Sequence, residues 1–172
     1  DYPEPIVAGR ARERRTDVLI EGEEWELVSE GHQFTEGPAV SPSGEVFFTD
    51  VSGGVIHRIA LDGTTTPFVE GEPGVNGLMF GPDGYLYCCH GGDRAIVRFD
   101  AEGNKETIIT DAPCNDLTLL HDGTGYYTDP ENKQVWWFTS AGDRRVVDEG
   151  IEFANGVIAS TDQTLLFVAD TR

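Results

Sequence analysis

The sequence predicts an all-β fold, and within that class a β-propeller whose blades are four-stranded antiparallel sheets. Three observations support this. A repeat of about 40 residues runs along the chain. Each repeat holds four short runs rich in Val, Ile, Phe, Tyr and Thr, and turns containing Gly, Pro or Asp separate the runs. Repeats of this length with four strands each are typical of propeller blades.

The repeats begin at Glu36, Asn76, Asn115 and Asn155, which follow one another at intervals of 40, 39 and 40 residues. A second set of turn positions, at Gly63, Gly103 and Gly142, keeps the same spacing. Every repeat therefore starts with an acid or amide side chain. In a radial arrangement these four equivalent side chains converge on the axis of the ring.

The second repeat shows the predicted strands most clearly. They are Gly77–Phe80, Tyr85–His90, Ala95–Phe99 and Glu106–Thr110. The fourth repeat supplies only its first two strands, Gly156–Ala159 and Leu165–Ala169, before the chain ends at Arg172. The chain thus accounts for about three and a half blades. Because propellers have four to eight blades, we expect it to be part of a longer protein.

The residues before the first repeat predict how the ring closes. Leu27–Gly31 matches the end of the outer strand of later repeats, for example Phe68–Gly71. An N-terminal outer strand commonly completes the last blade and removes an open sheet edge, so residues 24–30 are assigned to a closing strand. The domain organisation is then an N-terminal arm at 1–16 and a partial propeller at 17–172.

Composition limits the partners and the compartment. The net charge is −19, which argues against binding to nucleic-acid phosphates, and no apolar run is long enough to span a membrane. Cys88 and Cys89 are adjacent and should face opposite sides of a strand; together with Cys114 they do not form a disulfide framework. A reducing compartment, the cytoplasm, is favoured. The periplasm or secretion are alternatives if a signal peptide was removed.

Antiparallel order places the entry of each repeat and the end of its second strand on one face. Glu36, Asn76, Asn115 and Asn155 should therefore ring the propeller axis on that face. An oxygen-lined ring suits a hard cation: Ca²⁺ is favoured, with Zn²⁺, Mg²⁺, Mn²⁺ or Fe as alternatives. The competing interpretation is that each side chain only caps a turn or bonds loop backbone.

The second strands end on the same face at Asp50, His90, Asp129 and Asp170. Because Asp recurs there in most blades, a loop-holding role is favoured over catalysis. His90, Arg94 and Asp129 are nevertheless candidates for a substrate pocket by their position. The alternative for His90 is bonding to loop backbone, and for Arg94 a solvated loop position.

Several motifs, taken in order, resemble those of one known family. They are Phe34-Thr-Glu-Gly-Pro-Ala, Asn76-Gly-Leu, Asn115-Asp-Leu with Tyr126-Tyr-Thr-Asp-Pro, and Asn155-Gly-Val, and the similarity runs from about Trp25 to Arg172. The family is that of senescence marker protein, gluconolactonase and regucalcin. The resemblance implies a propeller of six blades when complete, a divalent metal, often calcium, in the central channel, and hydrolysis of sugar-acid lactones. Distant relatives hydrolyse phosphotriesters.

The resemblance also assigns roles to single residues. Glu36, Asn115 and Asn155 match three metal ligands, and Asn76 matches a residue of the substrate pocket. The fourth ligand, which also serves as the general base, would be an Asp on the fifth blade, beyond Arg172. The catalytic residue is therefore not assigned within this chain.

The resulting hypothesis is a metal-dependent lactonase, of which this chain is a fragment that lacks the catalytic Asp and is inactive alone. Pro113 stands where regucalcin-type members have an arginine, so the particular sugar lactone is left open. The alternatives are a phosphotriesterase-like hydrolase on the same propeller, or a non-enzymatic module that binds a ligand or protein. The expected partner is a small-molecule lactone, not nucleic acid or a membrane. Open sheet edges also predict self-association or pairing with the missing half.

Overall fold

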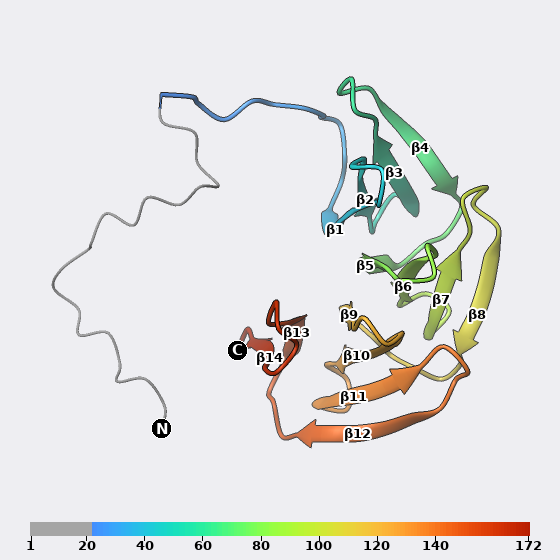
Figure 1. Cartoon of the computed structure of the whole chain (residues 1–172), viewed down its shortest axis with the longest axis vertical. Coiled ribbons are helices and arrows are strands. Elements are labelled where there is room, and N and C mark those ends of the chain that lie inside the picture. The colour runs from blue at the N-terminus through green and yellow to red at the C-terminus, as the bar shows by residue number, and fades with distance from the viewer. Residues whose placement is uncertain (1–21) are drawn as a thin grey trace, which may run out of the picture.

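The computed structural model describes residues 22–172, and within this range every regular element is a β-strand. The predicted N-terminal arm at 1–16 lies outside the described residues. Figure 1 shows the strands gathered into successive blades along an arc, with β1, β5, β9 and β13 on its inner side. The all-β propeller architecture predicted from the repeat is therefore confirmed. Nothing in the described range is a helix long and apolar enough to cross a bilayer.

Three of the sheets are four-stranded antiparallel meanders in chain order. The first contains β1 (Thr35–Val40), β2 (Val46–Asp50), β3 (Val55–Ile59) and β4 (Thr65–Glu70). The second contains β5 (Val75–Phe80), β6 (Leu86–His90), β7 (Ala95–Phe99) and β8 (Lys105–Ile109). The third contains β9 (Leu117–Leu119), β10 (Thr124–Asp129), β11 (Gln134–Thr139) and β12 (Arg144–Glu149).

The fourth sheet pairs only β13 (Ala154–Ala159) with β14 (Leu166–Asp170). The described chain thus holds three blades and half of a fourth, as the repeat predicts. Residues 24–30 form no strand, and Trp25 and Leu27 are 94% and 74% exposed. Among residues 22–172 no sheet pairs with this segment. The closing strand therefore stays a prediction.

The turn between the first two strands of each blade needs a residue with positive φ. Gly44, Gly84 and Gly123 supply it, with φ of 91°, 84° and 82°. The fourth repeat has Gln163 at the same position, with φ of 58°. Glycine adopts this region without steric cost, whereas other L-residues are disfavoured there. This explains why the Gly recurs at the repeat spacing.

The core lies between neighbouring blades. Alternation along β6 sends Cys88 into the cluster that contains Phe47 and Phe99, and sends Cys89 into the cluster that contains Tyr127. The predicted opposite orientation of the two adjacent cysteines is confirmed. Phe99 is fully buried, and burial of a side chain of this size contributes about 2–3 kcal/mol. The blades are thus joined by apolar packing on both faces of the second sheet, which fixes the positions of their inner strands.

Candidate functional site

The first residues of the four repeats lie together. Glu36, Asn76, Asn115 and Asn155 all line one cavity of about 380 Å³, whose remaining lining comes from the inner strands β1, β5, β9 and β13 and the residues that precede β9. The repeat predicted this convergence from spacing alone. Whether these side chains bind metal is a separate matter that stays a prediction.

An irregularity in each inner strand places these residues. The antiparallel register shifts between Glu36 and Ala39, between Val75 and Leu78, and between Ala154 and Val157. In the third blade regular pairing begins only at Leu117, after Asn115. Bulges of this kind re-aim side chains and commonly stand near functional sites. The ring residues are therefore carried on backbone that departs from the flat ladder in every blade.

Two buried threonines fix the backbone of the ring from the neighbouring blade. Thr49 Oγ1 donates to the carbonyl oxygen of Asn76 at 3.1 Å, and Thr128 Oγ1 donates to that of Asn155 at 2.6 Å. Both threonines precede the Asp that ends a second strand. The sequence signal for this role is the recurrence of Thr before the Asp in Phe-Thr-Asp and Tyr-Thr-Asp, and the repeat alone did not predict it.

Asp116 is a cavity residue that the sequence analysis did not single out. Its Oδ1 accepts the N–H of Leu117 and its Oδ2 accepts the N–H of Val157, each at 2.9 Å. Burial raises the pKa of Asp116, and the nearby charge of Glu36 adds to the rise. The cavity thus brings a second carboxylate close to the predicted ring.

The signal for Asp116 was a break in the repeat. The residue after the ring position is Gly37, Gly77 or Gly156 in the other blades, and Asp only in the third. A Cβ on Gly77 would lie 2.2 Å from Asp116 Oδ1. The position of the Asp116 carboxylate therefore leaves no room for a side chain at Gly77.

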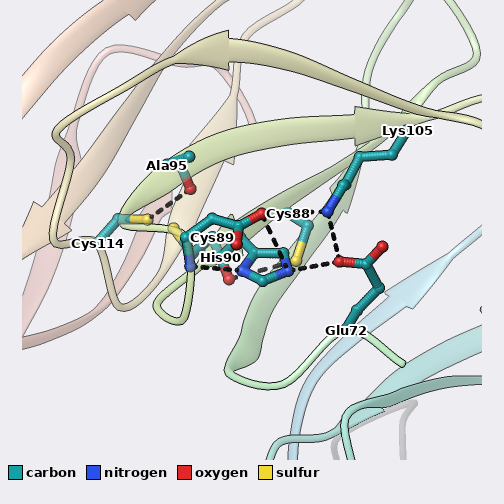
Figure 2. Close-up of polar contacts among 8 residues, drawn as sticks. Glu72, Cys88, Cys89, His90, Ala95, Lys105 and Cys114 are labelled. Carbon is teal, nitrogen blue, oxygen red and sulfur yellow. Dashed lines mark hydrogen bonds and ion pairs between the residues drawn. The ribbon is translucent and has the colours of Figure 1, made fainter. Parts of the chain in front are cut away.

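His90 does not line this cavity. It is 1% exposed, its Nδ1 accepts the N–H of Asp93 at 3.0 Å, and its Nε2 lies 2.8 Å from Glu72 Oε2. Since Nδ1 is the acceptor, Nε2 carries the proton and donates to the carboxylate. Figure 2 shows His90 beside Glu72, with Lys105 Nζ reaching the same carboxylate at 2.6 Å. Both ring nitrogens are engaged within the protein.

The other residues that end the second strands also hold loops. Asp50 Oδ1 accepts the N–H of Gly53 at 3.2 Å, and Asp129 Oδ1 accepts that of Asn132 at 2.9 Å. Asp170 accepts the N–H of Phe153 at 3.1 Å. The loop-holding role predicted from recurrence is confirmed.

Arg94 and Asp129 also lie outside the cavity lining. Arg94 is exposed at a positive φ of 53° and pairs with Glu131, with Nη2 and Oε1 3.2 Å apart. Asp129 is buried and both its oxygens bond Asn132. The structure thus separates His90, Arg94 and Asp129 from the ring, and their assignment to a substrate pocket stays a prediction.

The fold and the cavity define a class: a β-propeller with an acid- and amide-lined mouth formed by the starts of its inner strands. The chain belongs to the family described as the SMP-30/Gluconolactonase/LRE-like region, whose model matches residues 34–172. The family resemblance seen in the motifs is confirmed.

Individual relatives agree with this assignment. The chain is 25% identical to gluconolactonase of Zymomonas mobilis over 85% of its own length and 51% of the relative, and 27% identical to lactonase drp35 of Staphylococcus haemolyticus over 88% and 52%. It superposes on the gluconolactonase structure from Xanthomonas campestris with a TM-score of 0.77 at 22% identity, covering 84% of this chain and 57% of that one. The chain spans about half the length of the curated relatives it matches.

Proposed function

We propose that the protein is a metal-dependent hydrolase that acts on sugar-acid lactones. The observation that carries the proposal is the convergence of Glu36, Asn115 and Asn155 on one cavity, each from the start of a different inner strand. Membership of a family whose relatives are named gluconolactonase and lactonase supports the hydrolase class.

The donor set fits a hard divalent cation. Glu36 offers a carboxylate, Asn115 and Asn155 offer amide carbonyl oxygens, and among the described lining residues none is Lys, Arg or His. Oxygen ligands of this kind favour Ca²⁺ over softer metals, with Zn²⁺, Mg²⁺, Mn²⁺ or Fe as the alternatives. When bound, the cation would polarise the lactone carbonyl and stabilise the negative charge that develops on its oxygen.

The remaining cavity residues have positioning roles in this proposal. Asn76 faces the same space and offers an amide to the substrate. Both oxygens of Asp116 accept backbone N–H groups, so we assign this carboxylate to ordering the ring. The general base is assigned to an Asp on a fifth blade, as the family resemblance implies, and we expect little turnover by a 172-residue product.

Steady-state hydrolysis by a form that carries the complete set of blades tests the proposal. We expect turnover of sugar-acid lactones, and a loss of kcat/KM of more than about 100-fold in Glu36→Gln, beyond the 10–100-fold typical of residues that only support a ligand. Glu102→Gln, in an exposed turn, is the matched control and should keep full activity. Equal activity in both variants would contradict the proposal.

A substrate panel separates the rival functions. Preference for phosphotriesters over lactones would assign the same ring to a phosphotriesterase-like hydrolase. If neither class is hydrolysed but the protein still binds a small molecule or another protein, the propeller is a non-enzymatic binding module. The fold alone does not decide among these, because one architecture serves many chemistries.

A further inference from the structure

A second group of candidate ligands lies on the first blade, away from the central cavity. His32, Asp50 and His57 each offer one ligand atom, and these atoms lie within 4.8 Å of one another. We call them the first-blade histidine cluster. His32 precedes β1, Asp50 ends β2, and His57 stands in the middle of β3. None of the three lines the cavity of the ring residues.

The cluster lies on the face of the first sheet that points away from the second blade. Phe47 and Ile56 pack in the core shared with that blade, and His57 pairs with Phe48 in the ladder. Since neighbouring residues on a strand face opposite sides, Phe48 and His57 share the other face.

Local contacts hold each member of the cluster in place. Asp50 is 5% exposed and accepts the N–H groups of Gln33 and Phe34 at 3.0 and 3.1 Å. The His57 ring stacks on Phe48 with centroids 5.0 Å apart and planes 19° apart. Ser29 Oγ lies 2.7 Å from His32 Nε2, and the two imidazole centroids are 4.5 Å apart. The group is therefore ordered before any ligand arrives.

The second blade shows how the equivalent place is filled there. One repeat of 40 residues later, Glu72 stands at the position of His32 and His90 at the position of Asp50. The acid and the imidazole have therefore exchanged positions. In that blade the ammonium of Lys105 lies 2.6 Å from Glu72 and 3.1 Å from Asp93, and supplies a cation from the chain itself.

The first blade has no such internal cation. The position equivalent to Lys105 is Thr65, and within the described residues no Lys or Arg forms an ion pair with Asp50. The first-blade histidine cluster thus presents two imidazoles and a carboxylate that, within the described residues, has no Lys or Arg ion-pair partner.

We propose that the first-blade histidine cluster binds one divalent transition-metal ion, of which zinc is the type. Two imidazole nitrogens and one carboxylate oxygen are a common zinc donor set, with a water completing the tetrahedron. Ligand atoms in such a site lie about 3.3 Å apart, given bonds of about 2.0–2.1 Å, so ligand atoms that now lie within 4.8 Å of one another approach by up to about 1.5 Å on binding. The site differs from the oxygen-only ring, which favours calcium.

Binding would tie the loop before β1 to the middle of β3 and so stabilise the first blade. A metal that binds only the folded state raises the melting temperature by mass action. At a free zinc concentration 100 times Kd we expect a rise of about 5–10 °C. Substitution of a ligand should abolish this rise.

Cobalt titration of the chelator-treated 172-residue chain tests the proposal, because imidazole-bound Co²⁺ in a tetrahedral site gives strong visible absorption. We expect the tetrahedral absorption to saturate at one equivalent of Co²⁺, and the binding that it reports to be more than about 100-fold weaker in His32→Gln and in His57→Phe. The phenylalanine keeps the stack on Phe48 without a ligand atom. His121→Gln, at an exposed turn, and Glu36→Gln should leave the cobalt spectrum unchanged.

The outcomes that overturn the proposal are equally specific. Unchanged cobalt binding in both His32→Gln and His57→Phe, or its loss in Glu36→Gln, would place the metal elsewhere. If a variant fails to fold by circular dichroism, imidazole NMR of the wild-type chain decides. Zinc should shift the signals of His32 and His57 and leave those of His90 and His121; the absence of any shift in the first two overturns the site.

Discussion

The carboxylate of Asp116 in the third blade accepts the backbone N–H of Val157 in the fourth, with Oδ2 and N 2.9 Å apart. Its other oxygen accepts the N–H of Leu117. One side chain thus joins two inner strands at the rim of the central cavity, where the bulged backbone leaves N–H groups without ladder partners. The link lies directly after Asn115 in the third blade and two residues after Asn155 in the fourth.

Substitution of Asp116 by Ala should therefore weaken the fold as well as the ring. Two N–H groups lose their acceptor, and we expect a loss of about 1–3 kcal/mol in the free energy of unfolding. Urea denaturation followed by tryptophan fluorescence measures it. Asp148→Ala, on the exposed last strand of the third blade, is the control and should change stability by less than about 0.5 kcal/mol. Equal effects of the two substitutions would contradict the linking role.

The glycine beside this carboxylate gives a second, steric test. A Cβ on Gly77 would lie 2.2 Å from Asp116 Oδ1 and 2.7 Å from its Cα, whereas a Cβ on Gly156 would meet nothing closer than 3.7 Å. We expect Gly77→Ala to cost about 1–3 kcal/mol through overpacking. Gly156→Ala should stay within about 0.5 kcal/mol of the wild type. The melting temperatures of both variants measure this difference. An unchanged melting temperature in Gly77→Ala would contradict the close contact between Gly77 and Asp116.

These residues show what the sequence could and could not predict. Spacing alone identified the blades and the convergence of Glu36, Asn76, Asn115 and Asn155, because a radial repeat brings equivalent positions to one axis. Spacing could not show that the Asp116 side chain links two inner strands, because Asp116 occurs at this position in one repeat only and so contributes nothing to the periodic pattern. Nor could it show that His90 is enclosed, because its acid partner Glu72 is 18 residues away in sequence.

The exchange of acid and imidazole between blades predicts a compensating pair of substitutions. His90→Asp would place a carboxylate against Glu72 in a buried site and should destabilise the protein by about 1–3 kcal/mol. The double variant Glu72→His/His90→Asp restores an arrangement of the first-blade kind. We expect it to recover at least half of the loss, with a coupling energy of about 1 kcal/mol or more in a double-mutant cycle. Strictly additive losses would rule out a paired role.

The turns of the outer strands predict how stability depends on pH. Asp100 Oδ1 accepts the N–H of Asn104 at 2.8 Å, Oδ2 accepts from its side chain at 2.8 Å, and these bonds lower the pKa of Asp100. A lowered folded-state pKa gives stability that is present above the unfolded value of about 3.9 and is lost as the pH falls through the folded value. Hydrogen bonds within their own turns also lower the pKa of Asp62, between β3 and β4, and of Asp122 and Asp162, in the turns between the first two strands of the third and fourth sheets.

We therefore expect the unfolding free energy to fall below about pH 4, and to fall less steeply in Asp100→Ala. Glu102 lies in the same turn, and its side chain forms no hydrogen bond within the described residues. The unfolding free energy of Glu102→Gln should therefore fall with decreasing pH as steeply as that of the wild type. The measurement is urea denaturation at a series of pH values from 6 to 2.5. An equally steep fall of the unfolding free energy in wild type and Asp100→Ala would contradict the contribution of this carboxylate to stability.

The open end of the fourth sheet predicts self-association of a 172-residue product. Ile158 and Phe167 pair across β13 and β14, and are 63% and 55% exposed. Exposed apolar strands at a sheet edge favour pairing with another chain. We expect a dimer or larger species by light scattering, and at least a 10-fold weaker association in Phe167→Glu. Thr161→Glu, in the adjacent turn, should associate as the wild type does, and a monomeric wild type would contradict the prediction.

We propose that the oxygen-lined ring holds a cation that lactone hydrolysis requires. The most direct measurement is the rate of gluconolactone hydrolysis by a form with the complete set of blades, before chelation, after chelation and after Ca²⁺ is returned. We predict loss of the enzymatic rate on chelation and its recovery on addition of Ca²⁺ in the wild type, with no recovery in Glu36→Gln. An unchanged rate after complete removal of divalent metal would contradict a catalytic role for the cation.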